Sequence, residues 1–144
     1  MNQPSVYLDT TIPSYLFEER EELKALIQIT QQWWHQERQN FELYLSEETL
    51  TELNKGNYPN KTEVLNRIAE VLMLPPHSRI AEIVTVYVDN YLMPREVKAD
   101  AIHLAYASVY GLDFLVTWNY NHLANANKRQ HITGHQFTVG IIYP

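Results

Sequence analysis

The sequence predicts an α/β protein in which a parallel sheet carries helices on both faces. Two observations lead to this class. Short segments rich in β-branched and aromatic residues recur along the chain, and they alternate with longer segments whose apolar residues recur at helical spacing. Strands that alternate with helices favour a parallel sheet covered on both sides. The 144 residues contain no repeats and no long linker, so we expect one domain over residues 1–144.

The composition excludes several kinds of site. The chain has no cysteine, so it can form neither a disulfide nor a thiolate metal site, which fits a reducing cytoplasm. Eleven Lys and Arg against seventeen Asp and Glu give a net charge of −6, which counts against a stand-alone, high-affinity nucleic-acid binder. This acidic charge does not exclude an enzyme that binds phosphates through bound cations. We find no signal peptide and no membrane segment, so we expect a cytoplasmic protein with no membrane partner.

The first half of the chain begins with an apolar strand. Pro13 follows where the first turn of a helix tolerates proline. The next long segment carries Leu, Ile and Trp at near-helical spacing among Glu, Gln and Lys, and Trp33 and Trp34 there should pack in a core or an interface. The expected elements are a strand at Ser5–Leu8, a helix beginning near Thr11, a helix at Glu18–Arg38 and a strand at Phe41–Leu45.

The second half alternates in the same way. Ser46 should cap a short helix with an acidic first turn that ends near Gly56. The β-branched run "IVTVYV" is read as helix, although its composition also fits a strand. The remaining expected elements are helices at Asn60–Glu70, Ser78–Tyr91, "KADAIHLAYASVYG" and "NYNHLANANKR", an apolar segment "VLMLPP", and strands at Asp113–Thr117 and in "FTVGIIYP".

Polar residues fall where the expected strands end. Asp9 directly follows the first strand, and burying an unpaired charge there would cost several kcal/mol. Asp9 therefore either caps the next helix or binds a cation. Thr117 and Asn119 follow a later strand, and ligands of such sheets bind beyond the carboxyl ends of the strands.

Further carboxylates can join Asp9 at this edge. Glu48 and Glu52 are four residues apart on one helix face, and Asp100 lies near the start of its helix. A cleft holding Asp9, one glutamate, Asp100 and Asn119 would suit Mg²⁺ or Mn²⁺, which prefer carboxylate, amide and water oxygens. Such a cation can activate water and stabilise charge on a phosphate, so hydrolysis of a phosphodiester follows naturally.

Four motifs, in this order, resemble those of PIN domains of the VapC type, which are toxins of type II toxin–antitoxin pairs. They are "YLDTTIPSYL", "LSEETLTEL", "KADAIHLAYAS" and "DFLVTWNYNHLAN". The resemblance implies a three-layer α/β/α sandwich with a parallel sheet of four to five strands. It also implies a Mg²⁺- or Mn²⁺-dependent endoribonuclease with an RNA substrate, a cognate antitoxin as partner, and a homodimer.

The same resemblance implies roles for individual residues. Asp9, Glu52 and Asp100 would hold the metal, with Thr10 and Thr117 in support. The fourth position, often Asp, is Asn119, whose amide lacks a charge, so a second cation should bind less tightly.

Other candidates have ordinary structural explanations. Asp9 can serve as a helix cap, and Glu48 in the first turn of a helix favours the helix dipole, so Glu52 is the preferred glutamate. His103 is more often a core or cleft-wall residue than a ligand, and Asn121 is more often a cap.

Two other functions compete with the nuclease. The first alternative is a catalytically weak or inactive module of the same fold that binds RNA or a protein, with Asn119 marking lost activity. A small-molecule phosphohydrolase is a third reading from "DTT", but the second Asp of that nucleophile loop is absent.

Overall fold

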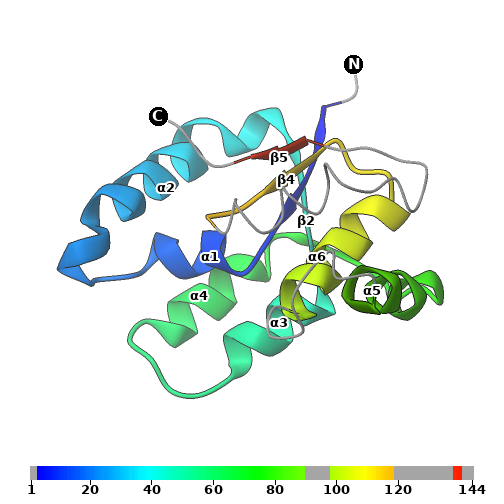
Figure 1. The fold of residues 1–144 in the computed structure, drawn as a ribbon. Coiled ribbons are helices and arrows are strands. Elements are labelled where there is room, and N and C mark those ends of the chain that lie inside the picture. Colours follow the sequence, from blue (N-terminus) through cyan, green and yellow to red (C-terminus); the bar gives the residue numbers. More distant parts are fainter. Residues whose placement is uncertain (1–2, 90–97, 119–137, 141–144) are drawn as a thin grey trace.

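The computed structural model describes residues 3–89, 98–118 and 138–140, and of residues 87–88, 98–100 and 138–140 it describes the backbone alone. Within these ranges, five strands form one sheet in the order β3-β2-β1-β4-β5, and every neighbouring pair is parallel (Figure 1). The predicted class and strand number are confirmed. The strands are β1 Ser5–Leu8, β2 Glu42–Ser46, β3 Leu72–Leu74, β4 Phe114–Val116 and β5 Thr138–Gly140.

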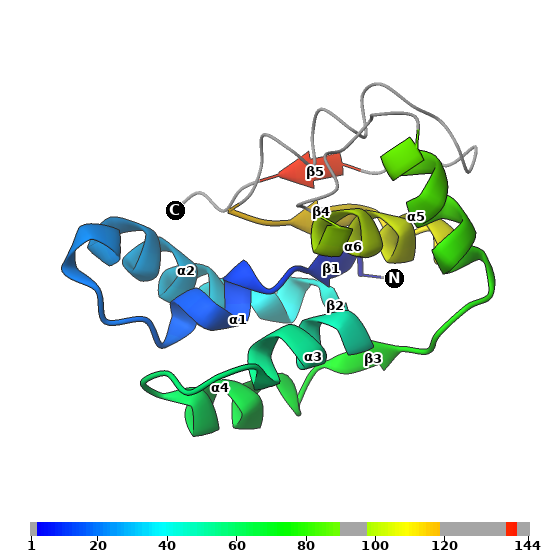
Figure 2. The same cartoon turned by 60° about the horizontal axis from the view of Figure 1, so that its bottom comes forward.

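Helices cover both faces of the sheet. α1 and α2 pack on one face and α5 and α6 on the other, while α3 and α4 lie beside β2 (Figures 1 and 2). The helices are α1 Thr11–Leu16, α2 Lys24–Gln36, α3 Glu47–Asn54, α4 Lys61–Ile68, α5 Arg79–Asp89 and α6 Lys98–Val109, with 3₁₀ turns at Glu21–Leu23 and Arg38–Asn40.

Strand alternation explains the three layers. Val6 and Leu8 of β1 point to the α1–α2 side, where they pack with Trp34. Tyr7, between them, points to the opposite side and packs with Leu104 of α6. One strand thus contributes to both cores, which is why the three residues after Ser5 in β1 are large and buried.

The long helix begins later than predicted. We expected it at Glu18, but α2 starts at Lys24, after the 3₁₀ turn. A carboxylate oxygen of Glu18 accepts hydrogen bonds from the backbone N–H groups of Glu19 and Arg20, and its other oxygen pairs with the Arg20 guanidinium. These local bonds compete with the helical ones, so Arg20 stays extended.

Several element predictions are confirmed and others are corrected. The run "IVTVYV" lies in α5 as predicted, with Ile83 and Val84 in the core. The apolar segment before Pro75 is a true edge strand, β3. Ser46 is the residue before α3, but its side chain makes no cap hydrogen bond.

The tryptophans settle one open alternative. Trp33 and Trp34 belong to the core on the α1–α2 side, with 9% and 2% of their surface exposed. The core alternative predicted for this pair is therefore confirmed, and a homodimer stays a prediction.

Two predictions fall outside the described residues: the helix in "NYNHLANANKR" and the termini of the last strand beyond Thr138–Gly140. In the described ranges, no helix combines the length and apolar character needed to cross a membrane.

Candidate functional site

The site lies at the carboxyl edge of the sheet. β1 and β4 are neighbours in register, with Leu8 opposite Val116, so the residues that follow them meet. These residues are Asp9 and Thr117, both buried. The backbone N–H of Asp9 also donates to the carbonyl oxygen of Val116, 3.4 Å away. The parallel topology alone therefore brings together two residues that are far apart in the sequence.

Asp9 is held by hydroxyl and amide donors. Its Oδ1 accepts hydrogen bonds from the backbone N–H of Thr11, at 3.0 Å, and from the Thr11 hydroxyl, at 2.5 Å. Its Oδ2 accepts a hydrogen bond from the Thr117 hydroxyl. Only 1% of Asp9 is exposed. The Thr11 contacts show that Asp9 does help to order the start of α1, while its buried carboxylate also faces the β4 edge.

Glu52 approaches the same edge from α3. Its Oε1 accepts a hydrogen bond of 2.7 Å from the hydroxyl of Thr10, the residue next to Asp9. The same oxygen lies 2.7 Å from Nε2 of His103, on α6. Thr10 therefore links the two carboxylates: it follows Asp9 in the chain, and its hydroxyl donates to Glu52. The structure brings Asp9, Thr10, Thr117 and Glu52 together, and it adds His103, which had been weighed mainly as a wall residue.

Behind His103 a hydrogen-bond chain runs into the core. The Tyr7 hydroxyl lies 2.5 Å from Nδ1 of His103 and 2.7 Å from the hydroxyl of Ser46. Tyr7, Ser46 and His103 are each at most 1% exposed. The Ser46 hydroxyl, which we expected at the helix cap, is used in this chain instead. Buried polar groups need such partners, because leaving one unpaired costs about 1–3 kcal/mol.

The charge of Glu52 follows from these contacts. Burial on its own would raise the pKa of the Glu52 carboxyl, but the hydrogen bond and charge of His103, together with the Thr10 hydroxyl, lower that pKa below its ordinary value. Burial raises the pKa of the Tyr7 phenol far above its ordinary value. Near neutral pH, Glu52 is therefore an anion and Tyr7 stays protonated, so Nε2 of His103 donates to Oε1.

The remaining predicted residues are only partly placed. The backbone of Asp100 lies in α6, one turn before His103, so both positions share one side of the helix. The side chain of Asp100 is not among those described. Asn119 and Asn121 lie outside the described residues.

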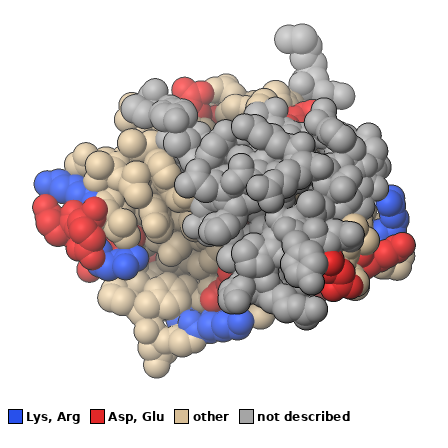
Figure 3. Space-filling model, viewed as in Figure 1, with Lys and Arg blue, Asp and Glu red and all other residues tan. Residues whose placement is uncertain are grey.

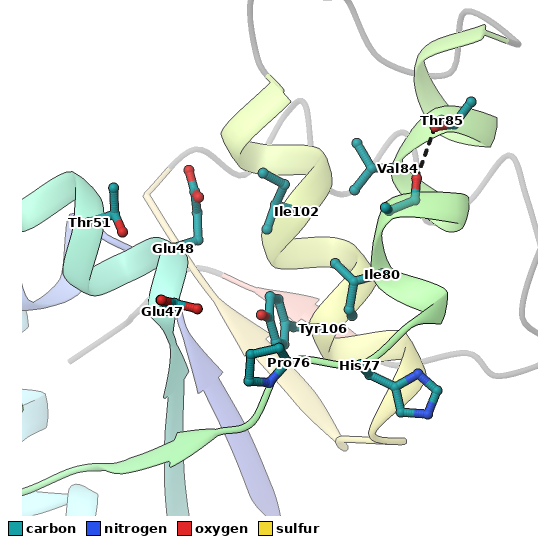
Figure 4. Close-up of a pocket in the computed structure, with 11 residues that line it drawn as sticks. Glu47, Glu48, Thr51, Pro76, His77, Ile80, Val84, Thr85, Ile102 and Tyr106 are labelled. Carbon is teal, nitrogen blue, oxygen red and sulfur yellow. Dashed lines mark hydrogen bonds between the residues drawn. The ribbon is translucent and has the colours of Figure 1, made fainter.

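Glu48 faces a different feature. It lines a cavity of about 490 Å³ with Glu47 and Thr51 of α3, and with residues of α5, α6 and the segment before α5. Figure 4 shows the two glutamates across from Ile80 and Tyr106. Glu52 is not among the residues that line this cavity. The structure therefore separates the two glutamates: Glu52 faces His103, and Glu48 faces the cavity.

The described surface offers no broad basic patch on the face shown in Figure 3, where Lys and Arg side chains lie among Asp and Glu side chains. Among the described residues, Arg20 forms an ion pair with Glu18 and Arg38 forms one with Glu70. The described basic side chains of this face therefore do not form a continuous phosphate-binding surface.

The donors suit a hard divalent cation. Glu52 accepts its hydrogen bonds on Oε1, and in the described part of the chain Oε2 accepts none, while a quarter of the side chain is exposed. Carboxylate oxygens of this kind are typical ligands of Mg²⁺ and Mn²⁺. Asp9 and Glu52 alone do not make a complete site, and no group of three acidic or histidine residues able to hold a metal is found among the described side chains.

Two solved structures share the fold. The structure of FitAcB from Neisseria gonorrhoeae matches with a TM-score of 0.58 at 17% identity, covering 96% of this chain and 97% of that one. The structure of VapBC-1 from nontypeable Haemophilus influenzae matches with a TM-score of 0.58 at 21% identity, covering 92% of this chain and 96% of that one. No family model and no curated protein matches the chain.

These comparisons correct the family prediction made from the motifs. Both structures carry the names of paired components, FitAcB and VapBC-1, and not of a VapC-type PIN domain alone. At 17% and 21% identity they show a shared fold and nothing finer. The prediction that the chain is a VapC-type PIN domain is therefore wrong. The comparisons show only that the chain shares its fold with these two structures.

Sequence reasoning missed Tyr7 and Ser46. A tyrosine in the middle of a buried strand is itself a signal, because its hydroxyl needs a partner in the core. The sequence alone does not say which partner, since the strand pattern fixes the face but not the opposing side chain.

Proposed function

We propose that the protein is a ribonuclease that depends on a divalent cation and belongs to a toxin–antitoxin system. The observation that carries the nuclease is the hydrogen bond from Thr10, the residue after the buried Asp9, to Glu52, which places Glu52 beside the carboxyl end of β1. The shared fold with the FitAcB and VapBC-1 structures supports a place in a toxin–antitoxin system.

In this proposal Asp9 and Glu52 hold the cation, Mg²⁺ or Mn²⁺, with Asp100 and Asn119 as further ligands. The chemistry supplied by such a cation is to make water more acidic and to offset charge on the phosphate. Thr11 and Thr117 keep both oxygens of Asp9 in place. Thr10 and His103 do the same for Oε1 of Glu52. Preorganised ligands of this kind lose little freedom when they bind.

The RNA substrate is proposed on chemical grounds. The chain is acidic, with a net charge of −6, so RNA would have to be drawn to the site by the cation and not by a basic surface. Cleavage would then depend strictly on the divalent ion.

An antitoxin is the proposed protein partner. The cavity beside α3 combines an apolar lining, including Ile80 and Val84, with the carboxylates of Glu47 and Glu48. This combination suits a peptide segment that carries apolar residues and Arg or Lys, and it does not suit RNA phosphates.

One observation favours a second candidate. His103 contacts the very oxygen of Glu52 that Thr10 also contacts, so Glu52 already has partners without a metal. A non-catalytic module of this fold that binds RNA or a protein could have the same hydrogen bonds at Glu52. A measurement of Mn²⁺ binding distinguishes the two functions, because only the nuclease requires the cation.

The decisive experiment incubates a labelled RNA with the purified protein and Mn²⁺, with and without EDTA, and compares wild type with Asp9→Asn and Asp100→Ala. The nuclease predicts cleavage that EDTA and both substitutions abolish. Cleavage that persists in Asp9→Asn would point to a contaminating nuclease, and a wild type that neither binds Mn²⁺ at millimolar concentration nor cleaves would leave the non-catalytic module.

The toxin role has its own test. Expression of the chain should arrest growth of the host, and co-expression of the product of an adjacent gene should restore it. Growth that is unaffected by an active, soluble nuclease would exclude the toxin.

A further inference from the structure

We propose that His103, held from behind by Tyr7, is a positioning residue that fixes Oε1 of Glu52 toward the protein and so presents Oε2 to a divalent cation. This inference rests on the proposed function. It assigns a task to two residues that the proposed metal ligands do not include.

The ring of His103 is fixed at both nitrogens. Nδ1 lies 2.5 Å from the Tyr7 hydroxyl, and Nε2 lies 2.7 Å from Oε1 of Glu52. The ring also packs against Tyr7, with centroids 5.4 Å apart. Only 1% of His103 is exposed. A histidine bonded at both ends and closed in by its surroundings has little freedom to turn, so its N–H points in one direction.

Tyr7 is in turn anchored by the sheet. It lies in the central strand, where its backbone pairs with Tyr44 on one side and with Leu115 on the other. Its hydroxyl has a second partner in Ser46, at the carboxyl end of β2. The position of the His103 ring is therefore fixed, through Tyr7 and Ser46, by the paired backbones of β1 and β2.

The consequence falls on Glu52. Two donors, Nε2 of His103 and the Thr10 hydroxyl, converge on one oxygen, so the carboxylate cannot rotate without losing both. In the described residues Oε2 accepts no hydrogen bond, and 25% of the side chain is exposed. Glu52 therefore offers one defined oxygen to a ligand arriving from solvent. Hydrogen-bond partners behind a ligating carboxylate typically change metal affinity by about 10–100-fold.

A purely structural role predicts something different. If the chain from Ser46 to Glu52 only satisfies buried polar groups, its removal should lower the free energy of unfolding and leave the cation affinity of the folded protein unchanged. Affinity for the cation, measured on folded protein, is thus the quantity that separates the two roles.

The test titrates Mn²⁺ alone, without RNA, into the protein of residues 1–144 by calorimetry. We expect His103→Ala to weaken Mn²⁺ binding about 10–100-fold. His103→Gln should restore much of the affinity, because its amide N–H can reach Oε1. Tyr7→Phe should cause a smaller loss, at most about tenfold, because it frees the ring without removing the donor.

Tyr44→Phe is the matched control. Tyr44 is the neighbour of Tyr7 in the sheet, and its hydroxyl bonds to Glu42 and not to His103. This variant should bind Mn²⁺ as wild type does. Urea unfolding of each variant shows which of them are folded, and if His103→Ala is not, His103→Gln and Tyr7→Phe decide the question.

The outcomes distinguish the two proposals. A wild type that binds Mn²⁺ while the folded His103 and Tyr7 variants bind it equally well would overturn the positioning role and leave the nuclease standing. A wild type that takes up no Mn²⁺ at millimolar concentration would overturn the nuclease, and the positioning role with it.

Discussion

At the scale of single residues, Asp9 has two tasks that one substitution can separate. Its carboxylate accepts hydrogen bonds from Thr11 and Thr117, and a helix-capping role needs only an acceptor oxygen, which asparagine also has. Metal binding needs the negative charge. Asp9→Asn should therefore abolish Mn²⁺ binding by calorimetry, while the free energy of unfolding falls by only about 1–3 kcal/mol because one amide N–H faces hydroxyl groups.

Asp113 supplies a matched control for this prediction. Its Oδ2 accepts hydrogen bonds from the backbone N–H and the hydroxyl of Ser5, at the opposite, amino end of β1 and β4. Asp113→Asn should cost less stability in urea unfolding, because its hydrogen bonds are exposed, and it should leave Mn²⁺ binding intact. Equal Mn²⁺ affinities for the two variants and wild type would show that Asp9 is a cap and not a ligand.

Glu52 predicts a pH dependence of stability. Because its pKa is lowered on folding, the folded protein holds fewer protons at Glu52 than the unfolded chain does under acidic conditions. The contribution of Glu52 to stability is therefore complete above the ordinary value of 4.5 and is lost as the pH falls from there through the lower folded pKa. The difference in free energy of unfolding between wild type and Glu52→Gln should shrink over that acidic range. Urea unfolding of both proteins from about pH 7 down to about pH 3 measures it, and a difference that grows on acidification would contradict the assigned direction.

At the scale of elements, the start of α4 depends on an unusual backbone. Asn60, the residue before the helix, has φ of 65°, and its side-chain amide donates to the carbonyl oxygen of Phe17 and to Glu19. A left-handed backbone costs a residue with a Cβ about 1–2 kcal/mol, which glycine avoids. Asn60→Ala should therefore lower the free energy of unfolding by about 2 kcal/mol and Asn60→Gly by about 1 kcal/mol.

Asn40 is the control for this order. Its amide also bonds to a nearby carboxylate, that of Glu37, but its φ is not positive. Alanine at position 40 should be tolerated at least as well as glycine in the same urea measurements. If Asn60→Gly lowered the free energy of unfolding more than Asn60→Ala, the left-handed backbone would not be the reason that asparagine is favoured at position 60.

The elements also show what the sequence can and cannot predict. The strands β1, β2 and β4 and the helices α5 and α6 were predictable because their apolar patterns reflect burial on the sheet, whereas the segment of β3 was expected only to be apolar. The delayed start of α2 was not predictable, because it depends on which backbone N–H groups the carboxylate of Glu18 accepts hydrogen bonds from. The meeting of Asp9 with Thr117 followed from parallel strands ending at one edge. The contact between Tyr7 and His103 did not, because a period of two places Tyr7 on a face of the sheet without naming the α6 residue opposite it.

At the scale of the whole molecule, the acidic charge constrains how RNA can be bound. A chain with a net charge of −6 repels a polyanion, and neutralising phosphates with Lys and Arg is the usual source of affinity. If a cation held by Asp9 and Glu52 supplies the missing positive charge, RNA binding and cation binding must be coupled. By linkage, each should then strengthen the other by the same factor.

This coupling can be measured with a labelled RNA that carries 2′-O-methyl groups, so that it is not cleaved. In EDTA we expect a dissociation constant weaker than about 0.1 mM near physiological salt, because even ordinary non-specific binders reach only about 10⁻⁴–10⁻⁶ M. Mn²⁺ should tighten binding at least tenfold in fluorescence anisotropy, and Asp9→Asn should remove the gain. Tight binding in EDTA that Mn²⁺ does not change would instead identify a surface that recognises RNA without the cation, and the non-catalytic module would then be the better account of this molecule.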